Sequence, residues 1–145
     1  MLGTVEFHYG TRDKIGYACR LLRKAYRSGA SVAVTGALPD LKALDRQLWV
    51  FDDVEFLPHV LAASEQAMPD RLLETAIWLT QDPRQAPGER SILINIGQSL
   101  PEGMDRYPRV FDIVSSEDQD RQLGRQRWKA YAGQGWQVNP HEIQE

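Results

Sequence analysis

Short apolar runs alternate along the chain with segments in which apolar residues recur at helical spacing. Residues 4–9 alternate between apolar and polar side chains and predict a first strand. Further strands are predicted at 31–35, 75–80, 91–96 and 110–114. The run at 31–35, SVAVT, is β-branched and almost wholly apolar, which is typical of a strand covered on both faces in a parallel sheet.

Three segments predict helices. The first spans about 13–28 with its apolar residues on one face, and Gly29 stands where a glycine commonly ends a helix. The second has Pro39 in its first turn and closes with Trp49. The third follows the last predicted strand and ends at about 133–136. These helices alternate with the strands, as in right-handed βαβ units.

Strands that alternate with helices predict the α/β class. We expect one domain over residues 1–145, with a mostly parallel open sheet flanked by helices, similar to a Rossmann fold but without its nucleotide-binding motif. The candidate turn at 10–16, GTRDKIG, has neither the Gly-x-Gly-x-x-Gly spacing nor the Gly-Lys-Ser/Thr of a phosphate loop. The three histidines are dispersed and Cys19 is the only cysteine, so we predict no metal site and no cofactor.

The connecting segments carry weaker signals. Residues 50–61 predict an irregular connection with apolar residues around Pro58. These residues either plug the edge of the sheet or form an exposed patch for a partner, and composition alone favours the plug. Residues 62–73 predict a loop with one helical turn, and 139–145 predict a frayed tail.

Composition narrows the classes of function. The chain has 145 residues, 42% of them hydrophobic and 26% charged, which are globular values. The formal net charge of −3 argues against non-specific binding to duplex DNA as the main activity. The N-terminus lacks a signal-peptide pattern, no window is apolar enough to span a membrane, and one cysteine fits a reducing compartment. We therefore expect a cytoplasmic protein without a membrane partner.

The last predicted helix carries the most informative charge pattern. Ser115 or Ser116 is its expected N-cap, and acidic residues fall in its first turn. Its basic residues recur at i, i+4 and i+8 beside an indole: Arg121, Arg125, Lys129 and Trp128. This pattern fits a solvated basic face or a dock for an acidic, partly apolar peptide. The pattern of this helix, taken alone, favours a solvated basic face over a peptide dock.

Several motifs, in order along the chain, resemble those of a known family. They are YRSG before SVAVT, LDRQLW at 44–49, FLPH at 56–59, SILINI, FDIV at 111–114 and RQRWKAY at 125–131. Together they resemble the chi subunit of the bacterial DNA polymerase III holoenzyme clamp-loader assembly, over most of the chain. The resemblance implies a non-catalytic adaptor of α/β fold that links the replicase to single-stranded DNA-binding protein.

The resemblance also implies two partner sites. One would bind the acidic C-terminal tail of single-stranded DNA-binding protein, which ends in Pro-Phe. Its residues would be Trp49, Val114, Arg125, Trp128 and Lys129. The other would bind the psi subunit, and its residues would be Phe56, Leu57, Pro58 and His59. The protein would then reach DNA only indirectly, and the 50–61 segment would be a partner patch.

Two other functions stay open on the sequence alone. A small α/β enzyme could bind a nucleotide or another ligand at the carboxyl edge of the sheet, where open α/β sheets usually bind ligands. A direct binder of single-stranded DNA could use the basic ladder for phosphates and Trp128 or Trp136 for stacking.

Overall fold

Seven strands and three α-helices make up the described parts of the computed structural model, which are residues 2–52, 55–62 and 69–144. The strands are β1 (Thr4–Thr11), β2 (Val32–Thr35), β3 (His59–Ala62), β4 (Ile77–Thr80), β5 (Ile92–Asn95), β6 (Arg109–Ser115) and β7 (Gln137–Glu142). The α-helices are α1 (Lys14–Arg27), α2 (Leu38–Val50) and α3 (Asp118–Gln134). Three short 3₁₀ helices lie in the connections: η1 (Asp70–Leu72), η2 (Pro83–Gln85) and η3 (Met104–Arg106).

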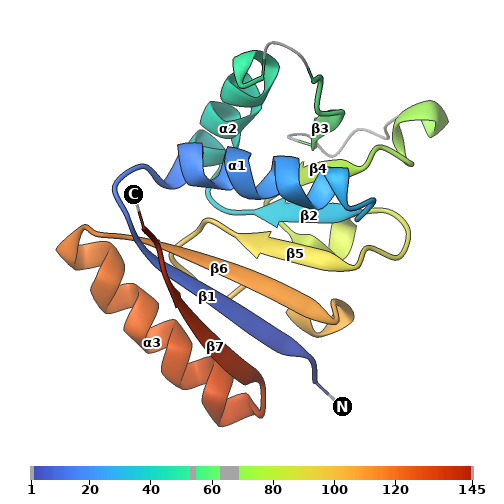
Figure 1. Ribbon diagram of the computed structural model, residues 1–145. Coiled ribbons are helices and arrows are strands. Elements are labelled where there is room, and N and C mark those ends of the chain that lie inside the picture. Colours follow the sequence, from blue (N-terminus) through green and yellow to red (C-terminus); the bar gives the residue numbers. More distant parts are fainter. Residues whose placement is uncertain (1, 53–54, 63–68, 145) are drawn as a thin grey trace.

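The described strands all run parallel in one sheet, in the order β3-β4-β2-β5-β6-β1-β7 (Figure 1). This arrangement confirms the expected α/β fold with a parallel, open sheet flanked by helices. Because β4, β2 and β5 are neighbours, their carboxyl ends meet at one edge of the sheet. Among the described helices, none is long and apolar enough to cross a membrane.

Helices cover both faces of the sheet (Figure 1). The sheet therefore divides the hydrophobic core into two clusters. On one face, Leu22 of α1 and Leu44 of α2 pack with Val34 of β2. On the other face, Tyr131 of α3 packs in the same cluster as Ala33 of β2. Successive residues of a strand point to opposite faces, which is why Ala33 and Val34 belong to different clusters. The sheet therefore separates the surface of α2 from the surface of α3.

The structure confirms the predicted ends of α1. Asp13 is the N-cap, and its Oδ1 accepts a hydrogen bond from the Gly16 amide at 3.0 Å. Gly29, just beyond the helix, has a φ of 84°, a left-handed conformation that favours glycine. In α2, Pro39 lies in the first turn as expected.

The predicted irregular connection at 50–61 is wrong in its last part, which forms β3 alongside β4. β3 has only four residues, and apolar residues precede it without a polar break, so its start has no sequence signal. Both alternatives hold, each for a different residue. Leu57 is 1% exposed and plugs the edge of the sheet, whereas Phe56 is 55% exposed and belongs to an exposed patch. Of the predicted loop at 62–73, residues 63–68 lie outside the described parts, and η1 supplies the single helical turn.

The predicted frayed tail at 139–145 is also wrong over 139–142, because β7 pairs with β1 along the edge of the sheet. Residue 145 lies outside the described parts. Pro140 of β7 lies opposite Phe7. The amides of Gln137 and Ile143 donate to carbonyl groups on the β1 side. Successive amides of a strand point in opposite directions, so position 140, an odd number of residues from both, faces away from β1, and the amide that proline lacks is not needed there. A proline is tolerated at such an edge position. The polar composition of β7 is compatible with an edge strand and hides it in the sequence.

The pairing of β1 with β7 also places two histidine rings together. The ring centroids of His8 and His141 are 4.7 Å apart, and His141 Nε2 lies 2.7 Å from Glu6 Oε2. His8 Nδ1 forms a short hydrogen bond with the hydroxyl group of Tyr17. Burial, followed by the charge of His141, lowers the pKa of His8 to about 4.

This histidine should make folding stability depend on pH. The folded-state pKa of His8, about 4, lies below its ordinary value of 6.5, so its neutral form stabilises the fold above 6.5 and this contribution is lost as the pH falls toward 4. His8→Phe keeps a ring that cannot titrate. Between about pH 7 and about pH 5, the full difference in proton binding would amount to roughly 2 kcal/mol. Because the His8 ring is only partly buried, solvent screening reduces this, and the variant should lose roughly 1 kcal/mol less unfolding free energy than the wild type. Equal losses in denaturant titrations would contradict this assignment.

Candidate functional site

α3 begins where β6 ends, and Asp120 fixes its first turn. The N-cap is Glu117, whose side chain makes no capping bond, so the predicted cap at Ser115 or Ser116 is wrong. β6 instead continues through Ser115, and the Ser115 amide donates to Asp120 Oδ2 at 2.7 Å. Lys14 Nζ lies 3.1 Å from the same oxygen. Burial opposes the charged carboxylate, but these hydrogen bonds and the charge of Lys14 outweigh it and lower the pKa of Asp120.

A buried ion pair holds the middle of α3 against the sheet. Arg127 is 2% exposed, and its Nε and Nη2 each donate to a different carboxylate oxygen of Asp112 on β6, both at 2.8 Å. The Tyr131 hydroxyl donates to the same carboxylate at 2.5 Å, and Asn95 Nδ2 approaches it at 3.3 Å. Arg127 Nη1 also donates to the Gln98 carbonyl at 3.0 Å. This network ties α3 to β6, β5 and the loop after β5.

The two titratable groups that α3 contributes to the network keep their protons. Burial opposes the charge on Arg127, but the hydrogen bonds and negative charge of Asp112 outweigh burial and raise the pKa of Arg127. Burial and the negative charge of Asp112 both raise the pKa of Tyr131. Arg127 therefore stays a cation and Tyr131 stays a hydrogen-bond donor.

A glycine lets α3 lie close to the sheet beside this pair. A Cβ atom on Gly124 would lie 2.9 Å from Val114 Cγ2 and 3.5 Å from the ring of Phe7. One turn further on, the Trp128 indole meets the Phe7 ring edge to face, with centroids 5.0 Å apart and an interplanar angle of 86°. Arg127 thus fixes the rotation of α3, and Gly124 fixes its distance from the sheet.

A pocket of about 320 Å³ opens between α3 and the strands, and we call it the α3 pocket. Its lining comprises Arg121, Arg125 and Trp128 of α3, Phe7 and Tyr9 of β1, Val114 of β6 and Pro140 of β7. Phe7 and Val114 are buried and form its floor, whereas Tyr9 is 38% exposed. The pocket therefore offers an apolar floor with exposed basic and aromatic groups around it.

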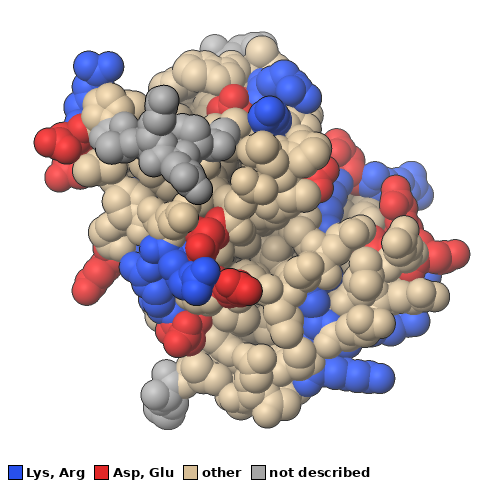
Figure 2. All heavy atoms as spheres, turned by 180° about the vertical axis from the view of Figure 1, so that it is seen from behind, with Lys and Arg blue, Asp and Glu red and all other residues tan. Residues whose placement is uncertain are grey.

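Basic groups of α3 stand at this pocket and beyond it. Arg121 has an acidic neighbour, since its Nη1 lies 3.8 Å from Asp118 Oδ1. Arg125 and Lys129 are exposed, and no carboxylate of the described residues lies within ion-pair distance of either. In Figure 2, basic side chains lie along the lower right of the molecule, the side that α3 occupies. This arrangement can bind a group that carries a ring and an anion together.

A second exposed apolar surface lies across the sheet from α3. At the end of α2, Trp49 is 59% exposed and Val50 is 74% exposed, and Phe56 before β3 is 55% exposed. The ring centroids of Trp49 and Phe56 are 5.3 Å apart. We call Trp49, Val50, Phe56 and the half-buried Pro58 the aromatic surface.

The structure brings together only some residues of the predicted tail site. Val114, Arg125 and Trp128 line the α3 pocket, and Lys129 lies next to it on α3. Trp49 does not line this pocket, because α2 covers the opposite face of the sheet. Its ring instead contacts Phe56 and the ring of His59, whose centroid is 4.9 Å away. In the structure, Trp49 thus belongs to the aromatic surface.

The predicted psi site divides into exposed and buried residues. Phe56 is exposed and Pro58 half-buried, but Leu57 is 1% exposed and the side chain of His59 is fully buried. His59 Nδ1 lies 2.7 Å from the Leu57 carbonyl oxygen, and its Nε2 lies 3.2 Å from Asp45 Oδ1 without hydrogen-bond geometry. Leu57 and His59 therefore support the aromatic surface from beneath.

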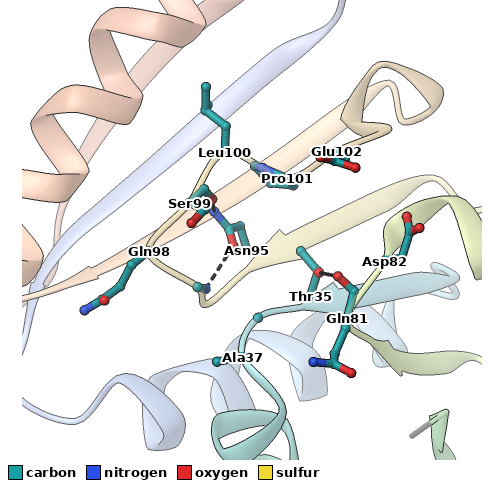
Figure 3. A pocket seen from close by; sticks show the side chains of 12 residues that line it. Thr35, Ala37, Gln81, Asp82, Asn95, Gln98, Ser99, Leu100, Pro101 and Glu102 are labelled. Carbon is teal, nitrogen blue, oxygen red and sulfur yellow. Dashed lines mark hydrogen bonds between the residues drawn. The ribbon is translucent and has the colours of Figure 1, made fainter. Parts of the chain in front are cut away.

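A further cavity, of about 490 Å³, lies at the carboxyl ends of β2, β4 and β5 (Figure 3). Its buried polar side chains already bond within the protein, since Thr35 Oγ1 donates to the Gln81 carbonyl at 3.1 Å and Asn95 Oδ1 accepts from a loop amide at 2.9 Å. Asp82 and Glu102 line it, and of the described residues no lysine or arginine does. This lining does not suit phosphate groups, which counts against a nucleotide-binding enzyme. Nor do the described residues include three or more His, Cys, Asp or Glu side chains placed to hold a metal ion.

Comparison with known proteins gives these surfaces a family context. Residues 2–139 match the family model described as DNA polymerase III chi subunit, HolC. The chain belongs to the DNA polymerase III chi subunit family. It is 30% identical to the chi subunit of Pseudomonas aeruginosa over 131 residues, which cover 90% of this chain and 87% of the relative. The chi subunits of Haemophilus influenzae and Escherichia coli are 29% and 32% identical, over 87% and 83% of this chain and 85% and 80% of their own.

Membership of the chi family confirms the resemblance drawn from the sequence motifs. It places the chain among the subunits of DNA polymerase III and therefore in DNA replication. Family membership does not say which residues meet a partner. That assignment depends on the two surfaces described above.

Three residues of the α3 pocket were not predicted from the sequence, namely Phe7, Tyr9 and Pro140. The alternation of β1 indicates that Phe7 and Tyr9 share a face, but not that α3 packs over that face. Pro140 fell in the supposed frayed tail. Asp112, which pairs with Arg127, lies in an apolar run with no signal for a buried carboxylate.

Two arginines on α3 should differ sharply in their effect on stability. Arg127→Met should lower the unfolding free energy by about 3–5 kcal/mol, because it leaves Asp112 buried without its cation. Arg125→Met, on the exposed face, should change it by less than about 0.5 kcal/mol. Denaturant unfolding measures both. Similar values for the two variants would refute the anchoring role of Arg127.

Proposed function

We propose that this chi-family chain is a non-catalytic adaptor with two partner sites. In this proposal the α3 pocket binds the acidic C-terminal tail of single-stranded DNA-binding protein, and the aromatic surface binds a psi subunit. The chain then links the replicase to DNA that is covered by single-stranded DNA-binding protein. The observation that carries the proposal is the α3 pocket, in which an apolar floor lies beside exposed guanidinium groups. A peptide that ends in an aromatic residue with a free carboxylate matches both features.

The terminal residue of the tail supplies the ring and the anion together. Its ring enters between the Trp128 indole and the floor at Val114, and its carboxylate pairs with Arg125. Lys129 attracts the acidic residues further upstream. A hydrogen bond to a charged group is worth roughly 1.5–3 kcal/mol, against less than about 1 kcal/mol for an exposed ion pair. Arg125 therefore contributes more affinity, and Lys129 mainly speeds association.

The aromatic surface suits an apolar partner. Trp49, Val50 and Phe56 are each more than half exposed, and the rings of Trp49 and Phe56 are in contact. Contiguous exposed apolar side chains commonly mark a protein interface, and aromatic residues are frequent binding hot spots. In this proposal Trp49 joins Phe56 and Pro58 in the psi site. Leu57 and His59 position these residues instead of meeting the partner.

Arg125→Ala should weaken binding of a fluorescent acidic peptide ending in Pro-Phe by about 10- to 100-fold. Arg121→Ala is the matched control, because Arg121 already has Asp118 nearby, and it should weaken binding by less than about fivefold. Fluorescence anisotropy gives both dissociation constants. Added salt should weaken binding by the wild type, since exposed charges are screened.

Equal losses for the two arginine variants, or a dissociation constant that does not respond to salt, would exclude this binding mode. A bare single-stranded oligonucleotide is the competing ligand. If it bound as tightly as the peptide and displaced it, direct DNA binding would be the better description of the α3 pocket.

Trp49→Ala and Trp128→Ala should separate the two partners. Truncation of an aromatic hot spot costs about 2 kcal/mol or more, which is roughly 30-fold in affinity. Trp49→Ala should therefore weaken binding of a purified psi subunit and leave the peptide unaffected, and Trp128→Ala should do the reverse. Calorimetry with the psi subunit and anisotropy with the peptide test this. Loss of peptide binding in Trp49→Ala would return Trp49 to the tail site.

A further inference from the structure

Part of the sheet extends beyond α1 on the face that α1 covers. Successive residues of a strand point to opposite faces, so the residues of β1, β6 and β7 that alternate with the lining of the α3 pocket point to the side of α1. In Figure 1, these three strands extend past α1 toward the N-terminus. We call this part of the sheet the open face. Its residues are Arg109 and Phe111 of β6, Thr4, Glu6 and His8 of β1, and Gln137, Asn139 and His141 of β7.

Planar side chains gather on the open face. His8 and His141 lie opposite each other in the β1–β7 register, with an angle of 33° between their ring planes. The ring of His8 also lies 5.4 Å from the ring of Phe111, centroid to centroid. The guanidinium group of Arg109 covers the Phe111 ring at 4.8 Å from its centroid. Since His141 and Arg109 are exposed, both present a flat surface to solvent.

Glu6 holds these two exposed groups in place from the middle of the open face. Its side chain is 12% exposed and lies 2.7 Å from His141 Nε2 and 3.9 Å from Arg109 Nε. Asn139 Nδ2 donates to the same carboxylate at 3.3 Å. Because these contacts already restrict the imidazole and the guanidinium, a ligand that stacks on them costs little further side-chain entropy.

Positive charge borders the open face along α1. Arg20 and Lys24 are exposed, and within the described part of the chain Lys24 forms no ion pair. Because α1 connects two parallel strands, it runs antiparallel to them. Lys24 follows Tyr17 by two helical turns on the same side of α1, so it lies toward the Arg109 end of the open face.

The electrostatics of His8 agree with this placement. Burial is the largest cause of its low pKa, and the positive charges of Arg109 and Lys24 lower that pKa further. The carboxylate of Glu6 is already paired with His141. The charge that remains around the open face is therefore positive, and it complements an anion.

We propose that the open face binds single-stranded nucleic acid, with bases stacked on His141 and Arg109 and with phosphates beside Lys24. Unpaired bases offer flat rings next to a regular row of negative charges, and the open face complements both. A duplex hides the faces of its bases, and a flat sheet does not enter its grooves. An acidic peptide has the charge without the row of rings. This inference does not rest on the proposed function, because the α3 pocket lies on the other face of the sheet.

The test titrates the full chain into a fluorescent single-stranded oligonucleotide of about twelve nucleotides at low salt, followed by anisotropy. DNA and RNA of the same sequence show whether the sugar matters. Saturable binding is expected with a dissociation constant of about 1–100 µM, and added salt should weaken it. The duplex of the same sequence should bind at least about fivefold more weakly, because it offers no base for stacking.

Arg109→Ala and His141→Ala should each weaken binding of the single strand by about fivefold or more, the effect of losing one stacked base. His141→Phe keeps a ring and should stay within about twofold of the wild type. Lys24→Ala should reduce the dependence on salt. Arg71→Ala is the matched control, since Arg71 is an exposed arginine on η1, before β4, and it should leave the affinity unchanged. Thermal unfolding verifies that each variant is folded.

Several results would overturn this inference. It is wrong if the wild type binds no single strand saturably at low salt, or binds the duplex as tightly. Displacement by polyglutamate at an equal concentration of charge would assign the open face to an acidic protein instead. If Arg125→Ala abolished binding and Arg109→Ala did not, the oligonucleotide would occupy the α3 pocket. A saturating acidic peptide ending in Pro-Phe should leave the oligonucleotide bound, and failure of that peptide to bind would count against the proposed function alone.

Discussion

The bidentate ion pair between Arg127 and Asp112 sets how α3 lies on the sheet. Taking both charges out of water is costly, so the pair adds little net stability, but any rotation of α3 that left one of them unpaired would be strongly disfavoured. Successive residues of a helix are about 100° apart. With Arg127 directed into the core, Trp128 lies beside the sheet and Arg125 faces outward. One buried contact thereby decides which side chains of α3 line the pocket.

The two candidate surfaces lie on opposite faces of the sheet, and this separation matters for an adaptor. α2 and its Trp49 belong to one face, and α3 and its Trp128 belong to the other. In the proposed function, the two partners therefore approach from opposite faces of the sheet. The sheet between them is buried and close-packed, and such cores deform little. We therefore expect the two sites to act largely independently.

The strands with continuous apolar runs could be predicted from the sequence because burial on both faces leaves a strong local signal. β7 could not, because an edge strand with polar residues and Pro140 resembles a tail until its partner β1 is known. The same limit applies to the site. Helical spacing identified Arg125 and Trp128, but Tyr9 and Pro140 enter the pocket only through the order of the strands. Trp49 shows a different limit, since residues grouped by resemblance to a family lie on different faces of the sheet in the structure.

The basic residues of α3 do not by themselves require an anionic partner. Acidic residues fill its first turn, where the helix dipole favours them, and its basic residues follow in the middle turns, with none in the last turn. Arg121 also has Asp118 within reach. The helix is therefore compatible with a solvated basic face, as its sequence alone suggested. What distinguishes a dock from a solvated face is the apolar floor at Phe7 and Val114, because a cation beside a ring-sized apolar pocket discriminates between anions that carry a ring and anions that do not.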